Sequence, residues 1–314
     1  MRDRDELLRI FSLHIRRILE RAAPDFDGLQ EIRLRAGRPL AIVERGREVF
    51  LTGDGARTRE AGAAWRVTAQ ELRETMEFVG EYSLYAYEDE LRQGYLTIRG
   101  GHRVGVAGRT VLDGDKVKSV RYISCVNVRL SHEVPGCADP VLPYLWGDEG
   151  LLHTLIISPP RCGKTTLLRD MVRQISDGSR ARRGYTVGVV DERSEICGCF
   201  MGIPENDVGI RTDVMDACPK AEGMMMLVRS MAPEVIAVDE IGRYEDIDAI
   251  ETVLYSGCRL IATVHGSSLS DIQAKPLFQR LAQEQVFERY VILGDSFRSG
   301  HIGEILDGRG RKLC

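Results

Sequence analysis

One stretch of nine residues, SPPRCGKTT at positions 158–166, constrains the fold of this chain more than any other feature. An apolar run precedes it and a run with helical periodicity follows it, which is the strand–loop–helix context of a phosphate-binding loop. In such loops the backbone amides and the amino end of the helix direct partial positive charge at a phosphate group. The stretch therefore predicts an open α/β sheet that holds a nucleotide at the carboxyl end of one strand.

The residues of this loop have separate expected roles. Lys164 would place its charge on the β- and γ-phosphate oxygens, the Thr165 hydroxyl would ligate Mg²⁺, and Thr166 would reach the α-phosphate. We expect the whole loop to contact ATP: Ser158, Pro159, Pro160, Arg161, Cys162, Gly163, Lys164, Thr165 and Thr166. Ser158 stands where such loops commonly begin with glycine, and the two prolines have no amide proton. A chance Gly-Lys-Thr at a helix start is the competing interpretation.

A second feature, VIAVDE at positions 235–240, makes that competing interpretation less favoured. Its four apolar residues predict a buried strand, so Asp239 and Glu240 emerge at the carboxyl end, where ligands bind in open α/β sheets. We expect Asp239 to hold Mg²⁺ through water and Glu240 to polarise the attacking water. Two exposed acids at a strand end are the alternative interpretation.

Two more strand ends carry polar side chains of the kind that a catalytic site needs. The run 187–196 ends in three acids: Asp191, Glu192 and Glu195. We leave open whether these acids position water or form a solvated turn. The run 260–266 delivers His265 to the same predicted sheet edge, and here we favour a γ-phosphate contact over a purely structural histidine.

The pattern of apolar residues divides the chain into two parts. Before residue 135 it predicts a helix over 5–22, a strand–turn–strand over 31–46, a helix opened by a Thr68–Glu71 capping box, and an antiparallel meander from Gly94 onward. Beyond residue 150 apolar strands alternate with amphipathic helices, which indicates a parallel sheet covered on both faces. We expect a smaller α+β domain over 1–135, a linker over 136–150 and an α/β core over 151–314.

Composition limits the class of protein and its compartment. The 314 residues are 43% hydrophobic and 29% charged, which is typical of a soluble globular protein. A formal net charge of −4 gives no long-range attraction to nucleic acid, which is disfavoured as a partner. The eight cysteines are scattered and fit reduced cytosolic thiols, and no stretch resembles a signal peptide or a membrane span. We expect a cytoplasmic protein.

The order of these features resembles that of the secretion and pilus-retraction ATPases, which are RecA-like hexamers with an N-terminal domain. The closer resemblance is to the stage III sporulation protein AA family. It is carried by EIRLRAGRPLAI, IRGGHRVGVAGR, ISPPRCGKTTLLRD, VVDERSEI, MLVRSMAPEVIAVDEIGR and ATVHG, which together span most of the chain. The resemblance implies a RecA-like P-loop core.

The resemblance also implies a task and partners. It implies a hexameric ATPase, peripheral to a membrane complex, that energises a secretion-like channel between mother cell and forespore during endospore formation. The implied partners are ATP with Mg²⁺, further copies of this chain, and membrane-embedded channel proteins at the cytoplasmic face. The pair Asp239–Glu240 differs from the Gly-Glu pair common in the secretion branch. We therefore leave open whether the acidic cluster shares the role of catalytic base with Glu240.

Three arginines on the predicted meander match an arginine-rich stretch of the secretion ATPases: Arg99, Arg103 and Arg109. A γ-phosphate often requires an arginine from a neighbouring subunit to neutralise charge in the transition state. We leave this role, with Arg103 as the catalytic candidate, open against ordinary pairing with carboxylates.

Two other functions remain as alternatives at this point. A nucleic-acid translocase would need a basic channel, and the sequence has no Lys/Arg run or interleaved aromatic stretch to supply one. A nucleotide-gated scaffold without significant turnover is disfavoured by the set Lys164, Asp239 and Glu240, although Ser158 keeps it open.

Overall fold

Two helices open the chain where the sequence pattern predicts a single helix over 5–22. They are α1 (Arg2–Arg9) and α2 (Leu13–Ala22). Between them Ser12 has φ −51° and ψ 149°, outside the helical region, and its backbone N–H donates to Oγ1 of Thr75, 3.1 Å away. The prediction of one continuous helix was wrong because this contact, 63 residues away in the chain, replaces a hydrogen bond within the helix.

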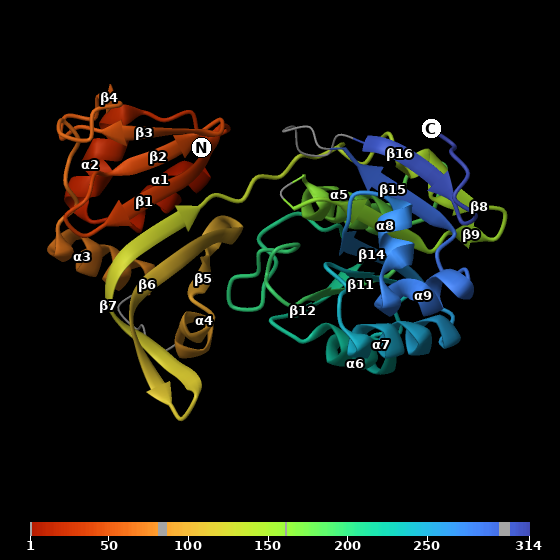
Figure 1. The fold of residues 1–314 in the computed structure, drawn as a ribbon. Coiled ribbons are helices and arrows are strands. Elements are labelled where there is room, and N and C mark those ends of the chain that lie inside the picture. The colour runs from red at the N-terminus through yellow and green to blue at the C-terminus, as the bar shows by residue number, and fades with distance from the viewer. Residues whose placement is uncertain (1, 81–86, 161, 295–301) are drawn as a thin grey trace. The chain divides into compact units, whose positions relative to one another are not determined.

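The structure is a computed structural model that describes residues 2–80, 87–160, 162–294 and 302–314 (Figure 1). The chain forms two compact units, one of Met1–His132 with Gly198–Glu205 and the other of Glu133–Cys197 with Asn206–Cys314. Residues 136–150, expected to link two domains, are part of the second unit, where three of their apolar side chains are fully buried: Ala138, Val141 and Leu145.

The first unit is built on an antiparallel sheet. Its strands are β1 (Leu29–Arg35), β2 (Ala41–Glu44), β3 (Arg47–Leu51), β4 (Arg57–Thr58), β5 (Tyr95–Ile98), β6 (His102–Asp113) and β7 (Lys116–Arg129). They lie in the order β4-β3-β2-β1-β7-β6-β5. The further helices are α3 (Ala69–Val79) and α4 (Glu88–Arg92), with a 3₁₀ turn at Arg99–Gly101. The structure confirms the expected capping box, in which Thr68 and Glu71 bond reciprocally.

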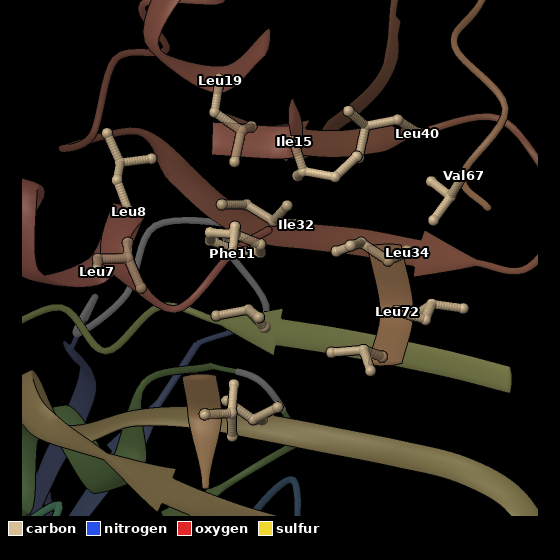
Figure 2. Close-up of a cluster of buried hydrophobic side chains, with 14 of the residues drawn as sticks. Leu7, Leu8, Phe11, Ile15, Leu19, Ile32, Leu34, Leu40, Val67 and Leu72 are labelled. Atoms are coloured by element: carbon tan, nitrogen blue, oxygen red, sulfur yellow. The ribbon is translucent and has the colours of Figure 1, made fainter. Parts of the chain in front are cut away.

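The core of the first unit lies between its helices and one face of this sheet. Figure 2 shows Phe11 and Ile15, from the helical segment, packed over Ile32 and Leu34 of β1. Side chains alternate between the two faces of a strand. Arg33 and Arg35 of β1 therefore lie on the face away from this core, which explains the alternation of apolar and basic residues in the sequence.

The second unit is built on a largely parallel sheet. Its strands are β10 (Thr154–Ser158), β11 (Val187–Asp191), β12 (Thr212–Asp216), β13 (Val235–Val238), β14 (Arg259–His265), β15 (Arg289–Leu293) and β16 (Ile302–Asp307). They lie in the order β12-β11-β13-β14-β10-β15-β16, and β16 pairs antiparallel with β15. A 3₁₀ turn and a small hairpin precede the sheet: Leu142–Tyr144, β8 (Trp146–Gly147) and β9 (Gly150–Leu151).

Helices cover both faces of this sheet, as the sequence predicts. They are α5 (Lys164–Asp177), α6 (Lys220–Ser230), α7 (Tyr244–Tyr255), α8 (Leu269–Ala274) and α9 (Pro276–Gln283). Leu155 and Ile157 of β10 share a buried cluster with Met224 of α6 and Ile250 of α7. Ile156 lies between them in the strand and faces the opposite side, where α5 packs against β10 and β14.

The strand order brings three loops to one edge of the sheet. β10, β14 and β13 are neighbours and run parallel, with Ser158 paired to His265 and Val238 paired to Ala262. Their carboxyl ends therefore meet at the same edge. Within the described part of the chain, none of the helices has the length and apolar character needed to cross a bilayer.

Candidate active site

The predicted phosphate-binding loop joins β10 to α5 by way of a glycine. Gly163 has φ +88°, a left-handed conformation that glycine adopts without steric cost, and it stands directly before the first residue of α5. Lys164 opens the helix and is buried. The fully buried Ser158 ends β10, and its hydroxyl donates to the Pro159 carbonyl (2.8 Å). Of the predicted loop residues, Arg161 lies outside the described residues.

The end of β13 meets this loop, as the sequence predicts for strands that end at the same edge of one sheet. Oγ1 of Thr165 donates to Oδ2 of Asp239 at 2.6 Å. Nζ of Lys164 lies 2.6 Å from Oε1 of Glu240 and 3.4 Å from Oδ1 of Asp239. A hydroxyl, an ammonium group and two carboxylates from segments more than 70 residues apart thus form one polar cluster.

β14 fixes the backbone and side chains of this cluster. The Thr263 hydroxyl donates to Oδ1 of Asp239 and accepts the backbone N–H of Glu240 at 2.9 Å. Glu240 has φ +56°, which costs a non-glycine residue about 1–3 kcal/mol. The bond from Glu240 to Thr263 helps to hold this conformation, because the Glu240 N–H points at a fully buried hydroxyl. Nε2 of His265 lies 2.9 Å from Oε1 of Glu240.

The electrostatics of Glu240 favour the ionised carboxylate. Burial favours the neutral acid, but the hydrogen bond and charge of Lys164, helped by His265 and Arg193, hold the pKa of Glu240 below its ordinary value. Nη1 of Arg193 lies 3.3 Å from Oε2 of Glu240. The carboxylate is therefore charged at neutral pH, the state in which it can orient and polarise a water molecule.

The three acids of the predicted cluster have three different surroundings. Among the described residues, ligand atoms of Glu195, Asp239 and Glu240 all lie within 4.8 Å of one another. Glu192 instead contacts the ammonium group of Lys220, and Nη1 of Arg243 lies 3.6 Å from it. The structure thus brings Glu195 to the phosphate-loop cluster and engages Glu192 in ion pairs beside it.

Asp191 differs from both of these glutamates because it is buried. Its carboxylate accepts the backbone N–H groups of three residues: Glu195, Ile196 and Cys197. Burial raises the pKa of Asp191 to about 6, against the effect of these backbone hydrogen bonds. Its contacts shape the loop that carries Glu195.

The oxygen donors at the site fit a magnesium ion. Mg²⁺ prefers hard oxygen ligands and commonly keeps several waters, with one or two carboxylates from the protein. Thr165 and Asp239 offer a hydroxyl and a carboxylate 2.6 Å apart, and the carboxylates of Glu195 and Glu240 lie close to Asp239. Thr165 and Asp239 are the residues that the sequence assigns to the metal.

The three arginines predicted to act between subunits all lie in the first unit. The Arg103 guanidinium stacks on the Tyr95 ring, 3.8 Å from its centroid, and Arg99 lies over the Phe200 ring. Arg109 is exposed on β6. It lies in the outer part of the β6–β7 hairpin, where β5 no longer pairs with β6 and β1 no longer pairs with β7. Their action across a subunit interface stays a prediction.

Sequence reasoning missed three basic residues near the site and the role of one hydroxyl. Lys220 pairs with Glu192, Arg193 pairs with Glu240, and Arg169 of α5 donates to the backbone carbonyl of Glu195. None stands in a spacing that marks it, because each acts on a segment distant in sequence. Thr263 belongs to the T-x-H pattern, but only the geometry shows that its hydroxyl joins Asp239 to Glu240.

Comparison with solved structures shows that this chain shares its fold with an ATPase and a pilus retraction motor. The chain resembles the Legionella pneumophila ATPase DotB with a TM-score of 0.58 and 16% identity, over 88% of this chain and 75% of that one. It resembles the pilus retraction motor PilT, solved with bound ADP, with a TM-score of 0.57 and 16% identity, over 88% and 77%. The predicted RecA-like α/β fold is confirmed.

Comparison of sequences identifies the family. The chain is 45% identical to the stage III sporulation protein AA of Bacillus subtilis over 285 residues, which are 91% of this chain and 89% of the relative. It is 30% identical over 217 residues to SEEDLING PLASTID DEVELOPMENT 1 of Arabidopsis thaliana, over 68% of this chain and 28% of that protein. The model of the family described as sporulation stage III, protein AA, matches residues 1–313. This chain therefore belongs to the stage III sporulation protein AA family.

Proposed function

We propose that this chain is a Mg²⁺-dependent ATPase that works as a motor of the secretion-ATPase type. The observation that carries the proposal is the convergence of Lys164 and Thr165 with Asp239 and Glu240 at one sheet edge. Each of these side chains has a counterpart role in phosphoryl transfer: phosphate binding, metal binding and orientation of water.

The proposed division of roles follows from the contacts. Lys164 and the amides at the start of α5 hold the phosphates, and Thr165 with Asp239 holds Mg²⁺, which neutralises phosphate charge when bound. Glu240 orients the attacking water. Thr263 fixes Glu240 and Asp239, and His265, which lies beside Glu240, would contact the terminal phosphate.

The test of this activity uses the purified full chain. We expect ATP hydrolysis that needs Mg²⁺ and stops on addition of EDTA, and Lys164→Ala should lower nucleotide affinity and abolish turnover. Hydrolysis by Lys164→Ala with an unchanged KM would overturn the phosphate-loop assignment. Tight ATP binding without turnover in the wild type would favour the nucleotide-gated scaffold instead.

We further propose that the chain acts as a hexamer, peripheral to a membrane complex, and energises a secretion-like channel between mother cell and forespore. The proposal is supported by membership of a sporulation family and by a fold shared with a pilus retraction motor. The partners would be membrane-embedded channel proteins. A monomeric mass in the presence of ATP and Mg²⁺ would exclude the ring, and stimulation of hydrolysis by single-stranded nucleic acid would favour a translocase.

A further inference from the structure

A buried arginine on the phosphate-loop helix is hydrogen-bonded to the loop that carries Glu195. Arg169 lies in the second turn of α5 and is 7% exposed. Its Nη2 donates to the backbone carbonyl of Glu195 at 2.7 Å, and its Nε donates to the carbonyl of Ile196. Two adjacent donors of one planar guanidinium thus hold two successive carbonyls, a geometry that the point charge of a lysine does not reproduce.

Asp191 accepts hydrogen bonds from the backbone N–H groups of these two residues and of Cys197. Its Oδ1 accepts the N–H of Glu195 at 2.8 Å, and its Oδ2 accepts those of Ile196 at 2.9 Å and Cys197 at 2.7 Å. Asn206 adds a third hold, since its Nδ2 donates to the Ile196 carbonyl at 3.0 Å. The loop backbone between β11 and Cys197 is therefore bonded on both its N–H and C=O groups.

The conformation of this loop also needs such support. Ser194, directly before Glu195, has φ +52°, a left-handed conformation that non-glycine residues adopt only when their surroundings impose it. Its hydroxyl donates to Asp216 of β12. Glu195 therefore leaves the loop in a direction set by Ser194, Arg169 and Asp191 together, and that direction brings its carboxylate to Asp239 and Glu240.

We propose that Arg169 is a positioning residue for ATP hydrolysis: it ties the phosphate-loop helix to the backbone of Glu195 and so fixes the Glu195 carboxylate beside Asp239 and Glu240. The inference rests on the proposed ATPase function. It assigns Arg169 no contact with the nucleotide. Its effect on turnover passes through Glu195, and its effect on nucleotide binding is small.

The kinetic test compares Arg169→Lys, Arg169→Met and Glu195→Gln with the double variant Arg169→Met/Glu195→Gln. Loss of the paired hydrogen bonds from the guanidinium group should lower kcat roughly tenfold in Arg169→Lys and Arg169→Met. The dissociation constant for nucleotide should stay within about threefold of wild type. Because Arg169 acts through Glu195, the double variant should lose no more activity than Glu195→Gln alone. The proposal would be overturned if the losses of the two single variants multiplied in the double variant, or if Arg169→Lys kept full activity.

Arg173→Met is the matched control on the same helix. Arg173 lies one turn further along α5 and donates to Asp170 of its own helix, at 3.0 and 2.6 Å. The same change of side chain there should leave kcat within about twofold. An equal loss in Arg173→Met would assign the effect to helix α5 in general. If Arg169→Met does not fold, Arg169→Lys carries the comparison.

A second measurement separates this inference from the ATPase proposal. Amide hydrogen exchange on the full chain reports the N–H groups of Glu195, Ile196 and Cys197 directly, whether or not the protein hydrolyses ATP. We expect slow exchange for these amides in the wild type and in Arg173→Met, and exchange at least tenfold faster in Arg169→Lys. Unchanged protection of these amides in Arg169→Lys would overturn the proposed role of Arg169, even if the enzyme is active. Faster exchange in a chain that never hydrolyses ATP would refute only the ATPase proposal.

Discussion

Lys164 and Glu240 form an ion pair in which Nζ lies 2.6 Å from Oε1, and the lysine side chain is only 8% exposed. Removing one partner of a nearly buried pair leaves the other charge uncompensated. Lys164→Met removes the cation shared by Asp239 and Glu240 and leaves the more exposed Arg193 beside Glu240, so we expect the free energy of unfolding to fall by about 1–3 kcal/mol. Adding Glu240→Gln should recover part of that loss.

Chemical unfolding of the two single variants and the double variant measures this coupling. Glu240→Gln alone should cost less than Lys164→Met, because Lys164 keeps Asp239 as a partner at 3.4 Å. Strictly additive losses would show that the pair contributes no stability of its own.

Because the carboxylates have different proposed roles, we expect their variants to differ in kinetics. Glu240→Gln removes the charge that orients water but leaves Thr165 and Asp239 in contact, so ATP should still bind while turnover falls about 10²–10⁴-fold. Glu192→Gln should cost less than Glu195→Gln, because Glu192 contacts Lys220 and Arg243 at the side of the site. Single-turnover hydrolysis and nucleotide titration check both statements. A larger loss of turnover in Glu192→Gln than in Glu240→Gln would assign the role of base to the acidic cluster.

The hydroxyl of Thr263 is expected to matter for turnover more than for folding. Thr263→Val keeps the shape but removes the donor to Asp239 and the acceptor for the Glu240 N–H. An unsatisfied buried group costs about 1–3 kcal/mol, which corresponds to roughly 10–100-fold in kcat if Glu240 shifts. Thr263→Ser, which keeps the hydroxyl, should stay within about threefold of wild type. Equal activity in the valine and serine variants would contradict the assigned role.

The stability of the first unit should depend on pH through Glu71. Its carboxylate accepts hydrogen bonds from the Thr68 N–H at 2.7 Å and from the Trp65 indole at 3.2 Å, and Nδ1 of His14 lies 2.7 Å away. Burial opposes ionisation, but these bonds outweigh it and lower the pKa of Glu71. A lowered pKa means that the stabilisation is complete above the unfolded-state pKa and is lost as pH falls through the folded-state value.

Glu71→Gln tests that dependence. At pH 7 it should destabilise the unit by about 1–3 kcal/mol, and the difference from wild type should shrink as the pH falls below 4.5, the ordinary pKa of a glutamate. The chain has two tryptophans, so a Trp146→Phe background leaves Trp65, in the first unit, as the reporter. Glu77→Gln, an exposed position on the same helix, is the control. If the difference in free energy of unfolding between Glu71→Gln and wild type stayed constant across pH, Glu71 would not be the source of the pH dependence.

Assembly makes a prediction that mixed subunits can check. If an arginine of the first unit completes a neighbour's site, Lys164→Ala and the triple variant Arg99→Ala/Arg103→Ala/Arg109→Ala are each inactive alone. In mixed rings some interfaces pair an intact phosphate loop with an intact arginine, so part of the activity should return. Specific activity of the wild type should also rise with protein concentration. Absence of recovery would show that these arginines act within one chain or not at all.

The parts that sequence predicted are those set by local pattern and by one topological rule. Apolar runs followed by polar residues marked β10, β11, β13 and β14, and parallel strands in one sheet present their carboxyl ends at a common edge. That rule alone brought Lys164, Asp239, Glu240 and His265 together. The Thr68–Glu71 capping box is equally local, with both partners within one turn of helix.

The parts that sequence missed depend on contacts between distant segments. The break at Ser12 follows from Thr75, which no periodicity in 5–22 reveals. The left-handed Glu240 is stabilised from the next strand, and Arg169 acts on carbonyl groups, which every residue has and which leave no mark in a sequence. β12, with every residue half-buried, lacks the apolar run that marks its neighbours.

The strand order of the second unit also has a consequence for how the protein is made on the ribosome. β10, which ends in the phosphate loop, is the first strand of its sheet to be synthesised, yet its partners β14 and β15 are the fifth and sixth. β10 therefore has no strand to pair with until residues up to His265 have emerged. A nascent chain that stops before β14 holds the complete loop sequence but cannot form the proposed nucleotide pocket, so under that proposal ATP cannot assist the early stages of its folding.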